Sequence, residues 1–130
     1  MAAATTLAQR GLSRATYWII TAVVVAECAI GGARDLLRAP PFYPMMLDLG
    51  YPAYLATILG VAKILAAVAL LVPDRARLKE WAYAGVVINM IGAAASWVAI
   101  HSTLDNIIPP LVFAGLAFAS SALRPPSRRL

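Results

Sequence analysis

The chain has few charged residues, which make up 13% of its 130 residues, against about 25% in an average soluble protein. Its single cysteine, Cys28, allows no disulfide within the chain and no Cys-x-x-Cys redox pair. Its single histidine, His101, has no second ligand at a metal-binding spacing, so the sequence predicts no metal site. A glycine-rich phosphate loop and a serine nucleophile motif are also lacking. The sequence therefore carries none of the common signatures of soluble enzymes.

Apolar residues are abundant instead. They form 62% of the chain, and the mean hydropathy is +0.77. The longest apolar run, residues 52–72, contains one charged residue, Lys63. As a helix it would be about 30 Å long, which is the thickness of the hydrocarbon core of a bilayer. We therefore predict an integral membrane protein.

Four apolar runs are long enough to cross a bilayer, at approximately residues 15–34, 53–72, 81–101 and 107–123. Short connections make successive helices antiparallel, so the predicted fold is an all-α, antiparallel four-transmembrane-helix bundle forming one membrane domain. Glu27 within the first run favours a retained helix over a cleaved signal peptide. The Pro-rich outer loop, residues 35–52, would be either a hydrophobic plug or a lid over a site.

The distribution of basic residues predicts the orientation of the bundle. Eight Lys and Arg residues fall on one side of the predicted bundle and only Arg34 and Arg38 on the other. The positive-inside rule then places both termini in the cytoplasm of a cell whose inner membrane holds the protein. The formal charge of +5 is spread over connections rather than gathered in one patch, so we predict the lipid bilayer, and no nucleic acid, as a partner.

The candidate catalytic group consists of three polar side chains from inside the predicted spans: Glu27, Lys63 and Asn89. The rise along a helix sets Lys63 and Asn89 at nearly the same depth, with Glu27 about 5 Å further out. A Glu27–Lys63 pair at about 4 Å would gain about 4 kcal/mol at an effective dielectric of about 20. Glu27 would act as general acid or base, Lys63 as its electrostatic partner and Asn89 as an orienting donor. The alternative is a buried ion pair that only fixes helix register.

The candidate binding residues around this group are Ser96, Trp97, His101, Tyr43 and Gly60. Ser96 shares one helix face with Asn89, and Gly60 allows close approach of a neighbouring helix beside Lys63. Each has a structural alternative. Ser96 would serve as an interhelical hydrogen-bond partner, and His101 as a residue that ends a helix.

Three segments resemble a known family: LGYPAYLATILGVAKILAAVALLVP (49–73), RLKEWAYAGVVINMIGAAAS (77–96) and PPLVFAGLAFASSALRPPSRR (109–129). They look like the DoxX-like family of small bacterial membrane proteins. The resemblance implies four transmembrane helices, with Lys63 and the Leu78–Gly85 stretch as characteristic positions. The wider superfamily is named after a quinol-oxidase-associated subunit, which implies a quinone ligand and a membrane redox partner. The lack of a cysteine pair departs from relatives linked to thiol chemistry.

Three functions remain open at this stage. The first is an auxiliary or redox-associated subunit that binds a lipophilic ligand or a partner within the bundle, and it is favoured because no catalytic arrangement is complete. The second is a stand-alone membrane enzyme doing isomerase-, cyclase- or hydrolase-type acid–base chemistry on a lipophilic substrate. The third is a small-solute or proton carrier. The sequence requires no cofactor and leaves a homo-oligomer open.

Overall fold

The computed structural model describes the backbone of residues 2–130 and the side chains of residues 9–130. Over this range the chain forms five α-helices and a final 3-10 turn: α1 (Ala2–Leu36), α2 (Phe42–Asp48), α3 (Tyr54–Leu71), α4 (Ala76–Ala99), α5 (Leu104–Ala122) and η1 (Pro126–Arg128). Four of them contain stretches long and apolar enough to cross a membrane, namely Gln9–Leu36, Tyr54–Leu71, Ala76–Ala99 and Leu104–Ala122. The predicted all-α membrane bundle is confirmed.

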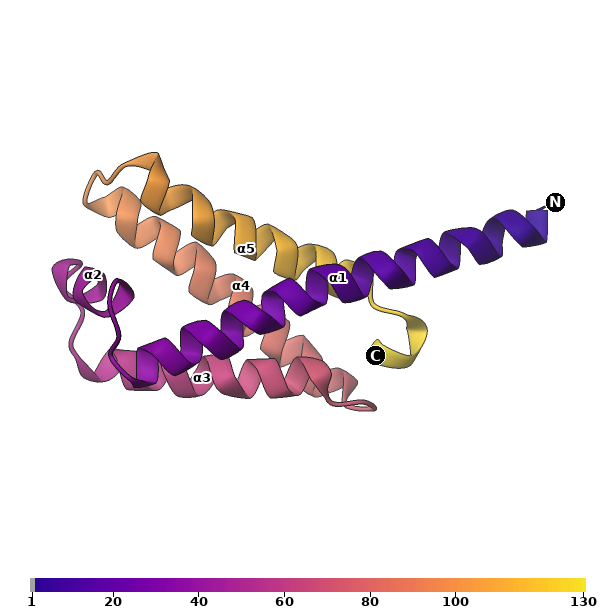
Figure 1. Ribbon diagram of the computed structural model, residues 1–130, viewed down its shortest axis with the longest axis horizontal. Helices are drawn as coiled ribbons and strands as arrows, with labels where there is room; N and C mark the ends of the chain where they lie inside the picture. The colour runs from indigo at the N-terminus through magenta and orange to yellow at the C-terminus, as the bar shows by residue number, and fades with distance from the viewer. Residues whose placement is uncertain (1) are drawn as a thin grey trace.

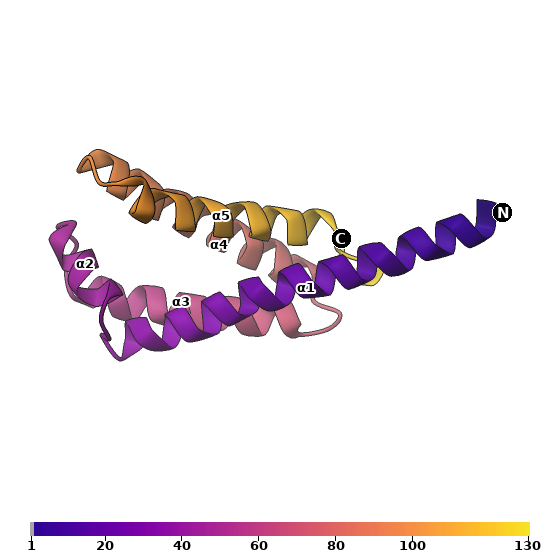
Figure 2. The same cartoon turned by 45° about the horizontal axis from the view of Figure 1, so that its top comes forward.

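The helices are arranged in two layers. Helices α1 and α3 pack along each other in one layer, and α4 and α5 in the other (Figure 1). Contacts of α3 with α4 and of α1 with α5 join the layers. Figure 2 shows the layers converging near the C-terminus and separating toward α2, which lies by the opening. The fold therefore leaves space between the layers at the α2 end.

Side-chain size is distributed as a lipid environment requires. The buried positions are mainly small, including Ala67, Ala94 and Ala117, whereas Ile88 and Phe118 are 70% and 69% exposed. In a membrane the hydrophobic effect does not drive helices together, because lipid tails are as apolar as the side chains. Small residues stabilise the contact instead, by letting helix backbones approach closely. Large apolar side chains cover the outside, as expected for a surface solvated by acyl chains rather than by water.

Two helices extend beyond the predicted spans, and the outer connection contains a helix of its own. Helix α1 begins at Ala2 and reaches Leu36, so it includes Asp35. Helix α4 begins at Ala76, five residues before the predicted start at Trp81. The connection at 35–52 contains α2, with Pro44 as its third residue. Proline is tolerated there because the N–H groups of the first helical turn have no acceptor within the helix, so the missing N–H costs no hydrogen bond.

The α1–α3 crossing depends on two glycines. A Cβ added to Gly32 would lie 3.0 Å from the carbonyl oxygen of Gly60, and one added to Gly60 would lie 2.9 Å from that of Gly32. Both contacts are to backbone, which cannot rotate away. Gly60, predicted as a binding residue, therefore serves the helix contact that brings Lys63 to α1, and it lines neither of the two cavities described below.

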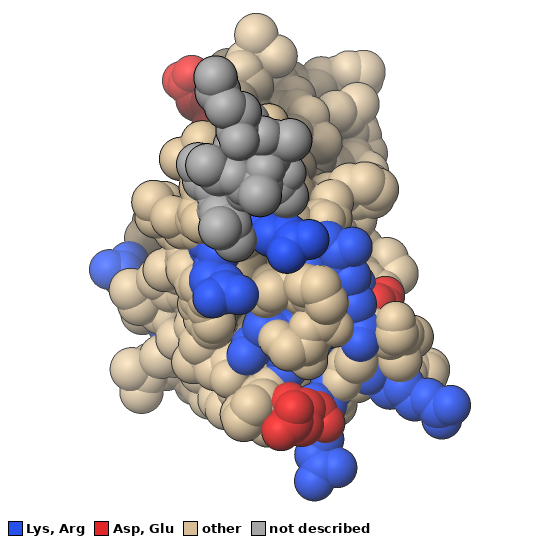
Figure 3. Space-filling model, turned by 90° about the vertical axis from the view of Figure 1, so that its right-hand side faces the viewer, with Lys and Arg blue, Asp and Glu red and all other residues tan. Residues whose placement is uncertain are grey.

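The two termini and the α3–α4 connection lie at the same end of the molecule, which we call the terminal end (Figure 1). Figure 3 shows Lys and Arg side chains gathered there. Two basic residues, Arg128 and Lys79, satisfy the last carbonyl groups of α3 at this end of the molecule. Arg128 Nη2 donates to the carbonyl oxygens of Leu70 and Leu71, at 2.7 and 3.2 Å. The fully buried Lys79 donates to the carbonyl oxygen of Val72.

Two further groups of side-chain hydrogen bonds join the helices near this cap. Arg128 Nε donates to Tyr17 Oη at 3.0 Å. Ser120 Oγ shares hydrogen bonds with Thr21 Oγ1 at 2.5 Å and with Tyr83 Oη at 2.7 Å, so it joins α5 to α1 and to α4. Residues of the characteristic Leu78–Gly85 stretch and of the C-terminal tail thus meet in one structural network. Arg124 extends it through its ion pair with Glu80.

Candidate functional site

A cluster of three charged side chains lies where α1 crosses α3. Glu27 and Asp35 are eight residues apart, close to two helical turns, and therefore share one face of α1. Lys63 reaches them from α3: its Nζ lies 3.7 Å from Glu27 Oε1 and 3.1 Å from Asp35 Oδ2. The three side chains retain 12–20% of their exposure. Gly31 provides the space that the Glu27 carboxylate occupies, since a Cβ at this position would lie 2.8 Å from Glu27 Oε1.

This ion cluster has more acceptors than donors. Two carboxylates face one ammonium, and the buried oxygens Glu27 Oε2 and Asp35 Oδ2 have no hydrogen-bond donor among the described residues. Asp35 Oδ2 keeps its ionic contact with Lys63, but the geometry is not that of a hydrogen bond. An unsatisfied buried acceptor costs about 1–3 kcal/mol. The cluster is therefore suited to receive a donor or a positive charge.

Two cavities meet at the ion cluster. The lateral cavity, about 510 Å³, lies mainly between α3 and α4 and is lined almost entirely by apolar groups. The outer cavity, about 380 Å³, lies beneath α2 at the opening between the layers. Both volumes fall in the range of small-molecule sites. They share five lining residues: Glu27, Leu59, Lys63, Asn89 and Met90.

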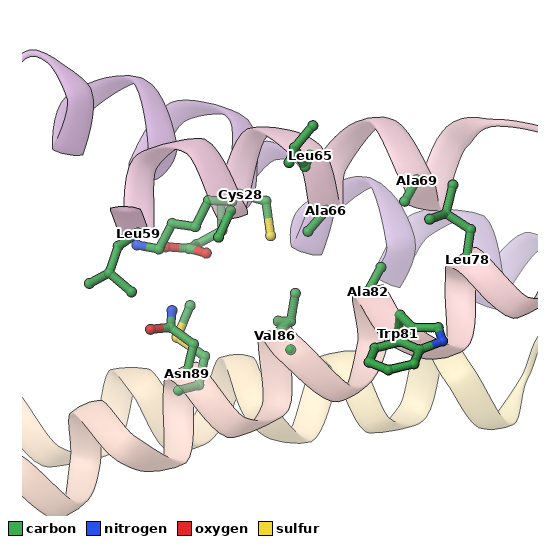
Figure 4. A pocket seen from close by; sticks show the side chains of 15 residues that line it. Cys28, Leu59, Leu65, Ala66, Ala69, Leu78, Trp81, Ala82, Val86 and Asn89 are labelled. Atoms are coloured by element: carbon green, nitrogen blue, oxygen red, sulfur yellow. The ribbon is translucent and has the colours of Figure 1, made fainter. Parts of the chain in front are cut away.

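The lateral cavity opens toward the lipid. Three residues line it and are also exposed on the outside of the bundle: Leu65 at 63%, Leu78 at 49% and Trp81 at 79%. Figure 4 shows Asn89 and Val86 projecting from α4 toward the layer that carries Cys28 and Leu59. The wall formed by α4 has a gap at Gly85, where an added Cβ would meet no atom within 4 Å. A molecule dissolved in the bilayer has a direct route to the cluster.

The outer cavity is bordered on one side by a contact between α4 and the segment that follows α2. Tyr51 Oη and Ser96 Oγ share a hydrogen bond of 2.5 Å, and Ser96 Oγ also donates to the carbonyl oxygen of Gly92 at 2.9 Å. Tyr43 and Trp97 line the same cavity. The outer connection therefore supplies part of the wall of the site.

The structure brings together most of the candidate residues. Glu27, Lys63 and Asn89 line both cavities, and Ser96, Trp97 and Tyr43 line the outer one. Their proposed chemical roles stay predictions.

His101 does not join them. It is exposed, lines neither cavity, and ends α4 in a left-handed conformation with φ 55°. The His101 and Ser102 N–H groups donate to the carbonyl oxygens of Val98 and Trp97, which is the Schellman arrangement at a helix C-terminus.

Asp35 and Tyr51 are site residues that the sequence analysis missed. Asp35 was assigned to the outer loop because the first span was predicted to end at Arg34. Its spacing of eight from Glu27 was the available signal. Among the described residues, no group of three or more His, Cys, Asp or Glu side chains could hold a metal ion.

The comparison with protein families gives one result. The family model described as the DoxX-like family matches residues 19–120, which include all three residues of the candidate catalytic group. No curated protein and no solved structure matches the chain.

Proposed function

This chain belongs to the DoxX-like family, and from that membership and its four apolar helices we propose that it is an auxiliary, redox-associated membrane subunit that binds a lipophilic molecule between its helix layers. The observation that carries the proposal is the lateral cavity. It is apolar along its length, opens between lipid-facing side chains and ends at the ion cluster. An amphiphile would bind with its chain in the cavity and its polar end at the ion cluster.

The ion cluster gives this ligand a fixed orientation. Charged groups inside a membrane are costly, and they are retained chiefly where they serve a function. The carboxylates of Glu27 and Asp35 would accept hydrogen bonds from the polar end, while Lys63 holds the two carboxylates in place. We also propose that both termini face the cytoplasm of a bacterial inner membrane, since Lys and Arg gather at the terminal end.

The quinone implied by the family resemblance does not fit the cluster in its oxidised form. An oxidised quinone offers carbonyl oxygens, which only accept hydrogen bonds. The single ammonium is already shared by two carboxylates, and the unsatisfied buried atoms are themselves acceptors. The residues present therefore call for a head group that donates.

The proposal is tested by photolabelling with hexadecanol that carries a diazirine in its chain, using protein in nanodiscs of neutral lipid. We expect labelling to concentrate in the segments 59–69 and 78–90, and to exceed labelling at Phe118, which faces lipid on α5. Gly85→Leu would fill the lateral cavity without striking backbone. It should reduce labelling of these segments about tenfold, equivalent to about 1.4 kcal/mol.

Gly115→Leu is the matched control, because Gly115 is exposed on α5, has open space around it and lines neither cavity. It should leave the labelling unchanged. Labelling of the cavity segments that is no stronger than that of Phe118, or that survives Gly85→Leu, would show that the space between the layers holds no ligand.

A second candidate function is acid–base catalysis on the bound molecule. The observation that favours it is Glu27 Oε2, which lies at the shared end of both cavities without a donor. Glu27 would take up or release a proton, with Lys63 stabilising its charge and Asn89 orienting the substrate.

Turnover can be sought by incubating the protein with native lipid extract and following the lipids by mass spectrometry. If Glu27 is the acid or base, Glu27→Gln should slow any conversion at least 100-fold, the lower range for loss of such a group. A folded Glu27→Gln variant that converts the same lipid at the wild-type rate would exclude this assignment.

A further inference from the structure

The walls of the two cavities carry an excess of negative charge. Their only basic side chain is Lys63, whereas Glu27, Asp35 and Asp105 are acidic. With all four groups ionised, the cavities have a net charge of −2. Glu27 and Asp35 are mostly buried, whereas Asp105 lies exposed at the rim. Uncompensated charge away from water is costly, so a ligand with a positive charge would gain more here than a neutral one.

Aromatic rings surround the same space. The outer cavity is lined by aromatic side chains from α2, from the segment that follows it, from α4 and from α5: Phe42, Tyr43, Tyr51, Trp97 and Phe113. The Tyr43 ring already has a cation over it, the Arg38 guanidinium at 5.6 Å, so binding a further cation falls to the other four rings. The faces of such rings attract cations, and rings gathered around one space are the common way to recognise an ammonium group. Carboxylates and aromatic rings together match an organic cation better than they match a hydrated metal ion.

From this we infer that the ligand is a single-chain amphiphile with an ammonium head group. The inference rests on the proposed function and names the ligand class. The head would lie between the ion cluster and the aromatic rings of the outer cavity. The chain would run through the lateral cavity, past the small residues Ala66, Ala82 and Gly85. A cavity of about 510 Å³ has the size of a site for one small ligand, and therefore for one chain rather than two.

The test compares three photolabelling probes with the same hexadecyl chain and diazirine but different heads: a primary amine, an alcohol and a sulfate. Labelling of the segments 59–69 and 78–90 is measured for each and divided by labelling at Phe118, which corrects for partition into the bilayer. We expect the ammonium probe to label the cavity at least tenfold more than the alcohol, and the sulfate to label it least.

Two variants connect this preference to the ion cluster. Glu27→Gln and Asp35→Asn each remove one negative charge, and each should reduce the preference for ammonium over alcohol to about threefold or less. Asp48→Asn is the matched control, because Asp48 is exposed and lines neither cavity. It should keep the full preference.

The possible outcomes separate this inference from the proposed function. Equal labelling by the amine and the alcohol, both blocked by Gly85→Leu, would overturn the ammonium head and leave the lipophilic site standing. Stronger labelling by the sulfate would also overturn it. Labelling that ignores Gly85→Leu for every probe would remove the site itself. An ammonium preference that both Glu27→Gln and Asp35→Asn leave unchanged would contradict the role given to the cluster.

Discussion

Lys63→Leu should lower the free energy of unfolding by about 3–5 kcal/mol, the usual cost of removing one partner from a buried ion pair. Among the described side chains, the ammonium of Lys63 is the only positive charge in contact with Glu27 and Asp35, and the variant would leave both carboxylates without it. Unfolding is measured by SDS titration of the protein in bicelles.

A compensating variant distinguishes this charge effect from loss of packing. Lys63→Leu combined with Glu27→Gln and Asp35→Asn removes the unpaired charges along with the lysine. It should recover most of the lost stability, because replacing a whole buried ion cluster costs little. Val61→Leu, at an exposed position of α3, should stay within about 0.5 kcal/mol of wild type. A single Lys63→Leu variant as stable as the wild type would show that the cluster does not hold α1 to α3.

The Glu27–Lys63 contact could be predicted from sequence because both residues are isolated charges in apolar runs. Depth along a helix follows from residue number, and the reach of a lysine covers the remaining offset. Asp35 could not be assigned in the same way. It follows Arg34, so a charged pair seemed to mark the start of the loop. In the structure α1 continues for two more residues, to Leu36, and Arg38 then adopts a left-handed conformation.

The two layers and their cavities were beyond sequence reasoning for a different reason. Gly60 was expected to allow close approach of a neighbouring helix beside Lys63, and in the structure it packs against Gly32 of α1. Gly85 and Gly92, by contrast, face open space. A missing side chain indicates either contact or cavity, and only the position of the opposite helix decides between them.

The basic terminal end shows the same limit for charged residues. Arg and Lys near a span end indicate orientation, and by that reasoning Lys79 and Arg128 belonged to a solvated connection and a basic tail. Their partners are backbone carbonyl groups at the C-terminus of α3, which have no hydrogen-bond donor within the helix because the helix ends there. Nothing in the local sequence of either residue marks it as a helix cap.

Arg128→Met should therefore lower the free energy of unfolding by about 2–4 kcal/mol, since hydrogen bonds to charged groups contribute about 1.5–3 kcal/mol each and their losses are not additive. The guanidinium donates to Leu70, Leu71 and Tyr17. It also lies 4.9 Å from the centre of the Trp18 ring. Removing it would leave the C-terminal carbonyl groups of α3 unsatisfied and release the tail from the bundle.

The planar guanidinium is what joins these partners, so Arg128→Lys should recover less than half of the loss, because an ammonium cannot span them in one geometry. Arg77→Met is the control: Arg77 is exposed and forms no ion pair with another described residue. It should change stability by less than about 0.5 kcal/mol. SDS titration gives the free energies, and faster hydrogen exchange at residues 123–130 would report release of the tail. Equal effects of Arg128→Met and Arg77→Met would mean that the tail adds only charge to this end, and that α3 is capped in another way.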